Sequence, residues 1–212
     1  EVDPSPDGHA VAFARLGASK DGDSFATLGV LERDTNVEHE LLKVPDAELA
    51  SVRWSPDGRR VAAVQRATVG SKTDIVIVDV VDGKAGGPPR YLPSPAPGAY
   101  GALAWNGDGH SLIVTRSENA QVYVPGVPAH LESIDITTGH RDALLFWPNL
   151  FGLFGATDAN GTVEVLRDGQ LVFSAVEAHQ NLRERAAGGR GVPGRKGVGT
   201  TGNSHDRQPA YS

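Results

Sequence analysis

Ser204, His205 and Asp206 are the three residue types of a serine-hydrolase triad, in which a base activates the serine hydroxyl for attack on a carbonyl. They are consecutive, and neighbours in an extended segment point in different directions, so they do not converge on one substrate atom. The Gly-x-Ser-x-Gly elbow that presents a reactive serine in many hydrolases occurs nowhere in the sequence. The sequence therefore predicts no catalytic residue in this chain.

Metal and nucleotide chemistry need ligand spacings that the sequence does not contain. The chain has 7 His and 0 Cys, and no two histidines are spaced as His-x-His or His-x-x-x-His. Asp21-Gly22-Asp23 resembles the start of a calcium loop, but the later ligands of an EF-hand are missing, which favours an ordinary acidic loop. The glycine-rich stretch 188–202 lacks the strand-then-helix context of a phosphate loop. We therefore expect no metal and no cofactor.

Three aspartates stand at equivalent places in a repeated turn, Ser-Pro-Asp-Gly, and could together form an acidic ring. An aspartate in such a turn accepts hydrogen bonds from nearby backbone N–H groups, and the glycine after it tolerates a positive φ. This favours a structural role for the aspartates over a ligand-binding role. The repeated pairs are Asp7 with Gly8, Asp57 with Gly58, and Asp108 with Gly109.

The turn returns at a nearly constant stride, because successive turn glycines stand 50, 51 and 52 residues apart. Short apolar runs flank each turn, as in Val52-Arg53-Trp54 and Val61-Ala62-Ala63-Val64 around the second copy, which is typical of a β-hairpin. The turn chemistry fits a type I turn closed by a glycine bulge. The four copies read Ser5-Pro6-Asp7-Gly8, Ser55-Pro56-Asp57-Gly58, Asn106-Gly107-Asp108-Gly109 and, weakly, Asp158-Ala159-Asn160-Gly161.

A second hairpin follows in each unit. In the second unit it consists of Ile75-Val76-Ile77-Val78-Asp79, a turn at Asp82-Gly83 and the short strand Arg90-Tyr91-Leu92. A unit of about 50 residues with four antiparallel strands is a propeller blade. We predict an all-β, partial β-propeller of four-stranded antiparallel blades. The expected blades span 1–45 (lacking its first strand), 46–95, 96–146 and, in part, 147–176, and a disordered, low-complexity Gly/Arg-rich tail spans 177–212.

Two further sets of residues are interpreted as structural. Trp54 and Trp105 end the first strand of successive units, where large aromatic side chains pack between blades. His9 and His110 directly follow the turn glycine, at the position that Arg59 takes in the second unit. A position that accepts arginine is expected to face solvent.

At these residues the sequence resembles the TolB-like, WD-like β-propeller repeat family, whose hallmark is an aromatic residue, a Ser-Pro-Asp-Gly turn and an apolar strand. Here that pattern reads Trp54-Ser55-Pro56-Asp57-Gly58-Arg59-Arg60-Val61-Ala62, with a second good copy over residues 5–13. The resemblance covers roughly residues 1–175. WD repeats proper have a shorter period of ~40–45 residues, and the single Gly86-Gly87 pair of the body is not repeated in phase as kelch repeats require.

The resemblance implies a fold more than a function. In periplasmic accessory proteins of this kind the propeller is a docking surface for other proteins, and in prolyl-oligopeptidase-like serine peptidases it gates a separate hydrolase domain. Neither use places catalytic residues in the blades. The resemblance also implies a periplasmic or extracytoplasmic location and six or more blades. Because the chain opens with Glu1 and contains no Met, we expect it to be a fragment of a longer protein.

The charge distribution argues against nucleic acid as the partner of the folded part. Residues 1–182 carry 14 Lys and Arg against 24 Asp and Glu, a net charge of −10, while 183–212 carry 6 basic and 2 acidic residues, a net charge of +4. Binding to phosphates needs a basic surface. RNA binding through the basic tail is the alternative that this leaves open. No apolar run approaches the ~18 residues of a membrane span, so we expect no transmembrane segment.

A protein or peptide is therefore the expected partner. Blades of a propeller bury their faces against one another, so the loops at the ends are free to vary. The variable connections are 17–24, 67–73 and 117–129, and the last contains an apolar run around Tyr123 and Val124, our candidate partner contacts. We predict a non-catalytic β-propeller module for protein–protein interaction. The alternative is the substrate-gating propeller of a prolyl-oligopeptidase-like serine peptidase whose catalytic domain lies outside this chain.

Overall fold

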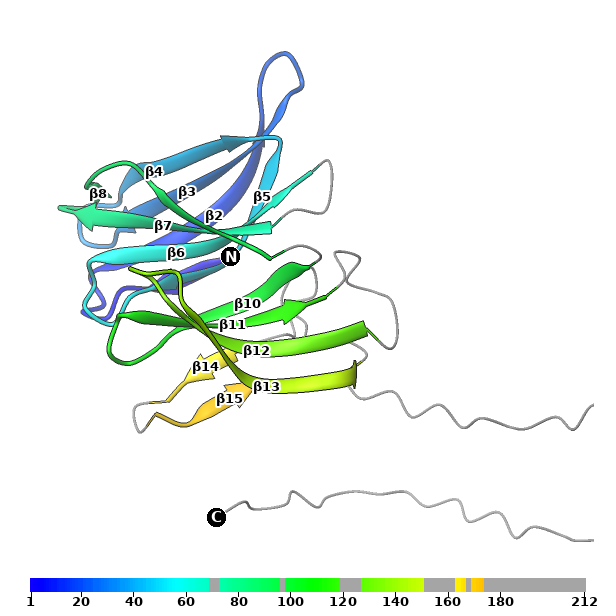
Figure 1. Cartoon of the computed structure of the whole chain (residues 1–212). Helices are drawn as coiled ribbons and strands as arrows, with labels where there is room; N and C mark the ends of the chain where they lie inside the picture. Colours follow the sequence, from blue (N-terminus) through cyan, green and yellow to red (C-terminus); the bar gives the residue numbers. More distant parts are fainter. Residues whose placement is uncertain (69–72, 96–97, 119–126, 151–162, 167–168, 174–212) are drawn as a thin grey trace, which may run out of the picture. The chain divides into compact units, whose positions relative to one another are not determined.

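The computed structural model describes residues 1–68, 73–95, 98–118, 127–150, 163–166 and 169–173. In these residues the regular structure consists of β-strands alone, grouped into four successive antiparallel sheets. The sheets follow one another along the chain, from the blue strands to the yellow ones in Figure 1. This confirms the prediction of an all-β, partial β-propeller, and each sheet is called a blade below. The predicted tail, 177–212, lies outside the described residues.

The strands of each blade have the following bounds. Blade 1 contains β1 (Val2–Pro4), β2 (Ala10–Ala18), β3 (Ser24–Glu32) and β4 (Val37–Pro45). Blade 2 contains β5 (Ala47–Trp54), β6 (Arg60–Ala67), β7 (Thr73–Val81), β8 (Lys84–Ala85) and β9 (Arg90–Pro93). Blade 3 contains β10 (Ala99–Trp105), β11 (Ser111–Ser117), β12 (Val127–Asp135) and β13 (Arg141–Leu150). Blade 4 is represented by β14 (Val163–Val165) and β15 (Leu171–Phe173).

Within each blade the strands pair antiparallel in sequence order, as in β1-β2-β3-β4 and β10-β11-β12-β13. In blade 2 the fourth position is shared, because both β8 and β9 pair with β7. The two-residue β8 extends the hairpin turn, and β9 supplies the longer ladder, from Asp74↔Pro93 to Ile77↔Arg90. The expected fourth strand of this unit therefore exists, with an irregular segment before it.

The prediction that blade 1 lacks its first strand is wrong. β1 pairs with β2 from Val2↔Phe13 to Pro4↔Val11. The sequence pattern does not predict this strand, because it has only 3 residues and ends in proline, which has no N–H to donate to a ladder. β1 lies at one end of the strand order of its sheet, and proline is tolerated in such an edge strand.

The repeated turn is held by its own serine and aspartate. In the second copy Gly58 donates its N–H to the carbonyl of Ser55 at 2.9 Å, and the Ser55 N–H donates to the carbonyl of Arg60 at 2.8 Å. The Asp57 carboxylate accepts from the Ser55 hydroxyl at 2.5 Å and from the Arg59 N–H at 3.1 Å. Gly58 has a φ of 69°, the left-handed value that the turn requires.

The other two described copies repeat this geometry. The Asp7 carboxylate accepts from the His9 N–H at 3.0 Å, and Asp108 accepts from the His110 N–H at 2.7 Å. Gly8 and Gly109, the turn glycines of these copies, have φ values of 77° and 69°. The turn bonds therefore depend on the aspartate and glycine and survive the loss of serine in the third copy. The fourth copy, 158–161, lies outside the described residues.

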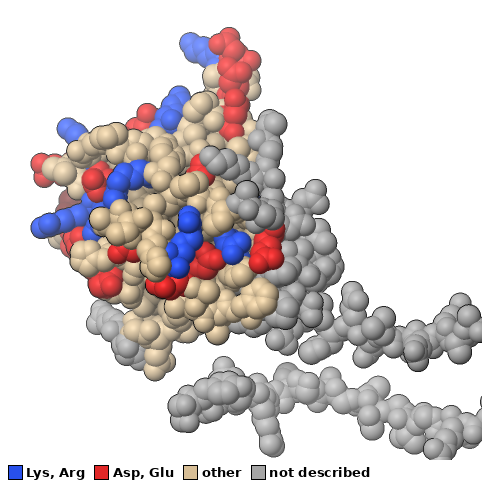
Figure 2. Space-filling model, viewed as in Figure 1, with Lys and Arg blue, Asp and Glu red and all other residues tan. Residues whose placement is uncertain are grey.

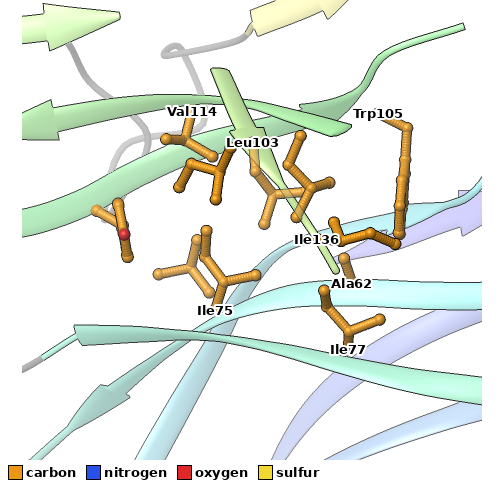
Figure 3. Packing of buried hydrophobic residues seen from close by; sticks show 11 residues of the cluster. Ala62, Ile75, Ile77, Leu103, Trp105, Val114 and Ile136 are labelled. Carbon is orange, nitrogen blue, oxygen red and sulfur yellow. The ribbon is translucent and has the colours of Figure 1, made fainter. Parts of the chain in front are cut away.

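Each pair of successive blades encloses a hydrophobic core. Trp54 is buried between blades 1 and 2 together with aliphatic side chains of both, and Trp105 takes the same place between blades 2 and 3. Figure 3 shows the second of these cores, where Trp105 lies beside Ala62 and Ile136. The two indoles are 8% and 6% exposed, which confirms the predicted packing between blades. A smaller core joins blade 3 to Val163 of blade 4.

Gly58→Ala tests the turn. We expect the free energy of unfolding to fall by about 1–2 kcal/mol, because a Cβ is penalised in the left-handed region. The cost is conformational, since the nearest atom to such a Cβ is Pro6 Cδ at 3.8 Å. Urea unfolding of the whole chain measures it. Gly107→Ala, where a Cβ meets nothing within 4 Å, is the control and is expected to change little; an equal loss in both variants would contradict the backbone explanation.

The hairpin turns also link stability to pH. The Ser5 hydroxyl and the His9 N–H hold the pKa of Asp7 below its ordinary value of 3.8. Partial burial raises the pKa of Asp57, but its hydrogen bonds outweigh that effect and the net pKa is lowered. The backbone N–H of Thr138 and its hydroxyl lower the pKa of Asp135, in the β12–β13 turn. Each carboxylate is thus more acidic in the folded chain than in the unfolded one.

We expect the free energy of unfolding to fall as the pH drops below about 4, because the unfolded chain then takes up protons before these folded-state carboxylates do. Above the ordinary aspartate pKa their contribution is complete. Urea unfolding at a series of pH values measures the slope, and Asp57→Asn should flatten it. A stability that rises on acidification would contradict the assignment.

Candidate functional site

The strand order gives the blades two different ends. Connections between first and second strands, and between third and fourth strands, are short turns at what we name the tight-turn end. The connections 19–23, 68–72 and 118–126 join second to third strands and so belong to the opposite, long-loop end. The candidate contacts Tyr123 and Val124 fall in the last of these and lie outside the described residues.

A cleft of about 320 Å³ lies between blades 1 and 2 at the tight-turn end. Its walls come from both hairpin turns of each blade, with the indole of Trp54 among them. The lining residues are Ser5, Asp7, His9, Ala10, Val30, Glu32, Asp34, Thr35, Trp54, Gly58, Val80, Asp82 and Gly83. A concave site lined by an aromatic side chain and a few polar groups is the usual form of a ligand site.

The cleft is acidic. Among its lining residues Asp7, Glu32, Asp34 and Asp82 carry carboxylates, and His9 carries the one imidazole. His9 Nδ1 lies 3.2 Å from a carboxylate oxygen of Asp34. Hydrogen bonds from the Thr35 hydroxyl and from His39 lower the pKa of Glu32, so it is ionised at neutral pH. The negative charge of the cleft can attract a cation, and its carboxylate oxygens can accept hydrogen bonds from that cation.

Polar contacts join the first-strand segments of successive blades. A Glu1 carboxylate oxygen accepts from the Ser51 N–H, and the Ser51 hydroxyl donates to the carbonyl of Gly101 at 3.4 Å. Asp3 accepts from the Trp54 N–H at 2.7 Å. Burial raises the pKa of this carboxyl, although the Trp54 bond opposes the shift.

Sequence reasoning missed this set of contacts. A signal was available, since Glu1, Ser51 and Gly101 stand 50 residues apart and share one place in the repeat. The signal was weak because the three residue types share no chemistry. Only their positions in neighbouring blades bring a carboxylate, an amide and a carbonyl into contact.

A second, more open recess of about 720 Å³ adjoins the cleft along β7. Its lining mixes both charge signs: it contains Arg59 and Arg60 together with Asp57, Asp79 and Asp82. On the face seen in Figure 2, basic and acidic side chains are likewise interspersed. His9 and His110 are exposed, as predicted.

Two negative findings concern the described part of the chain. It holds no group of three or more His, Cys, Asp or Glu side chains arranged to bind a metal ion. It also contains no helix with the length and apolarity needed to cross a membrane.

Solved structures share the fold at low sequence identity. A protein assigned as TolB from Agrobacterium tumefaciens is similar with a TM-score of 0.58 and 17% identity, over 84% of this chain and 57% of that one. A Mycobacterium tuberculosis puromycin-hydrolyzing peptidase is similar with a TM-score of 0.59 and 20% identity, over 82% of this chain and 27% of that one. Oligogalacturonate lyase from Vibrio parahaemolyticus is similar with a TM-score of 0.54 and 15% identity, over 84% of this chain and 46% of that one.

The chain thus spans between about a quarter and just over half the length of these structures. No curated protein matches the sequence significantly. The family described as the lipoprotein LpqB beta-propeller domain matches residues 20–144, which is more than half of the chain and includes all of the second blade. The repeated turns, the four-stranded blades and this match agree, and the chain belongs to the LpqB beta-propeller domain family.

Proposed function

We propose that this propeller is a non-catalytic module that binds a protein or peptide partner. The observation that carries the proposal is that different parts of a blade have different structural roles. Apolar faces are buried in the cores between blades, and the tight turns are held by their own side chains. The connection 19–23 at the other end contributes no residue to these cores, and loops of this kind can vary in sequence and serve recognition.

The best described of these connections is the β2–β3 hairpin. Its loop is closed by the Ser19 N–H, which donates to the Asp23 carbonyl at 2.8 Å, and it projects at the top of Figure 1. The β11–β12 connection has a different chemistry, with Tyr123 between Val122 and Val124. Tyrosine gives a large contact area with little loss of side-chain freedom, which supports this segment as the partner contact.

The family supports a location outside the cytoplasm, because it is described as a lipoprotein domain. It also supports an accessory rather than a catalytic role for this chain. The blade ranges 1–45, 46–95, 96–146 and 147–176 are proposed as its structural units, with 177–212 as a separate tail.

A second candidate function is the gating propeller of a larger peptidase. It is favoured by the similarity to the puromycin-hydrolyzing peptidase, of which this chain covers 27%. A propeller over a hydrolase domain restricts which substrates reach the active site. The parent reading frame decides between the two: a Gly-x-Ser-x-Gly elbow downstream of the blades supports gating, and its absence supports the binding module.

Alanine at both Tyr123 and Val124 tests the binding proposal. We expect capture of the partner from extracts of the source cells, measured by quantitative mass spectrometry, to fall about tenfold, because two interface side chains together contribute on the order of 1–2 kcal/mol. Val81→Ala is the matched control, since Val81 is a 59% exposed apolar residue next to the β7–β8 turn. Unchanged capture by the double variant, with unfolding as in the wild type, would remove these residues from the interface.

A further inference from the structure

The joints between blades 1 and 2 and between blades 2 and 3 can be compared position by position. The hydroxyl of Ser5 accepts the N–H of Ala10 at 2.9 Å, and the hydroxyl of Ser55 accepts the N–H of Arg60 at 2.9 Å. Both bonds span five residues from the first residue of the same turn. Ala10 and Arg60 are therefore equivalent positions in successive blades.

At the joint between blades 2 and 3, Arg60 covers the tryptophan. Its Cζ atom lies 5.3 Å from the centroid of the Trp105 ring, and Nη2 lies 3.1 Å from a carboxylate oxygen of Asp57. Only 16% of the arginine side chain is exposed. A guanidinium placed over an indole and paired with a carboxylate is attracted by both groups. This joint therefore contains a guanidinium site that the chain fills itself.

At the joint between blades 1 and 2 the same place holds alanine. Asp7 and Trp54 are the counterparts of the carboxylate and the indole, and both line the cleft of about 320 Å³ together with Ala10 and Gly58. The methyl group of Ala10 cannot reach what the guanidinium of Arg60 reaches. The cleft thus coincides with the position that an arginine side chain occupies one blade later.

The tryptophans of the two joints differ in their bonding. Trp105 Nε1 donates to the carbonyl of Arg53 at 3.1 Å. Trp54 Nε1 has no hydrogen-bond partner in the described part of the chain, although the side chain is only 8% exposed. Because a guanidinium carries donors only, it cannot pair with this N–H and can contact only the face of the ring.

The aspartates of the two joints also differ in their hydrogen bonds. Asp57 uses one oxygen within its turn and the other, Oδ2, for Arg60. Asp7 uses Oδ1 for the Ser5 hydroxyl and the His9 N–H, and no described residue bonds its Oδ2. The first joint therefore keeps a carboxylate oxygen for a donor from outside.

The charges around the cleft favour a cation. Its imidazole, His9, is already 3.2 Å from Asp34. Of the nearby basic side chains, Arg33 donates to the carbonyl of Gly8 at 3.0 Å and Lys84 interacts with Glu32. The remaining charged groups of the lining are carboxylates, so a guanidinium enters a negative potential.

We propose that the cleft between blades 1 and 2 binds the guanidinium group of an arginine side chain from a peptide partner, over Trp54 and paired with Asp7. The ligand takes the place that Arg60 takes at the next joint. Only one part of this inference rests on the proposed binding function, namely that the arginine comes from a peptide partner. The cleft itself is tested with a synthetic peptide, so it can fail while the long-loop interface holds, or hold while that interface fails.

The experiment is a titration of the whole chain with acetyl-Gly-Arg-Gly-amide, followed by the three tryptophan indole N–H signals in NMR spectra. We expect the Trp54 signal to shift with added peptide until binding is saturated, and the Trp105 signal to keep its chemical shift. The citrulline analogue has the same shape without the charge, and it should bind at least about tenfold more weakly. Equal binding of the two peptides, or equal shifts at both tryptophans, would overturn the proposal.

Ala10→Arg supplies the ligand from within the chain. We expect it to move the Trp54 signal without peptide and to abolish the titration, as Arg60 does at the next joint. Ala18→Arg adds the same charge at the exposed far end of the same strand, β2, and should leave the titration unchanged. Asp7→Asn should weaken binding severalfold, since it removes the paired charge. Full binding by Ala10→Arg would contradict the assigned place.

The basic tail of this chain is the other source of arginine. Alanine at Arg185, Arg190 and Arg195 distinguishes the sources. Unchanged Trp54 signals and peptide affinity in this variant indicate an external peptide, as proposed. A Trp54 signal that moves, with tighter peptide binding, shows that the tail occupies the cleft and overturns the proposed source.

Discussion

The hydrogen bonds of the repeated turn fix where each blade begins its second strand. In the second copy the carboxylate of Asp57 and the hydroxyl of Ser55 satisfy the backbone of a hairpin whose glycine sits at positive φ. A slip of one residue in the register would exchange the two faces of the sheet. The turn therefore decides which side chains meet the neighbouring blade, and the burial of Trp54 depends on it. The cores between blades and the clefts beside them follow from this local constraint.

A repeated scaffold makes equivalent positions comparable within one molecule. Trp54 and Trp105 are buried at successive joints by the same strand position, yet only the second has an arginine over its ring. Ala10 packs against the edge of the first core and Arg60 covers the indole at the second, so this position lies at the rim of the joint in both cases. Positions at the rim of a joint can thus diverge in chemistry while the stacking of blades is kept.

The two binding proposals place recognition at different ends of the blades and by different physical means. At the tight-turn end, rigid hairpins of two blades enclose an acidic cleft, which suits a small, charged group. At the long-loop end, the proposed contact segment around Tyr123 has residue types that suit a broad contact. A partner that used both ends would gain avidity from two separate sites, and membership in a lipoprotein propeller family is compatible with such an accessory role.

Much of the fold could be predicted from the sequence, because a turn needs only local residues: the stride, the hairpins, the blades and the packing of Trp54 all follow from apolar periodicity around Asp-Gly. The short strand β1 could not be predicted, because Val2–Pro4 is a strand through its pairing with β2 and not through its own composition. Most of the cleft could not be predicted either. Its carboxylates come from separate turns that no spacing connects, and the contrast between Ala10 and Arg60 gains meaning only beside two buried indoles. The sequence by itself determined the module, while the tertiary structure decided which polar groups meet, because contacts between blades join residues about 50 positions apart in the chain.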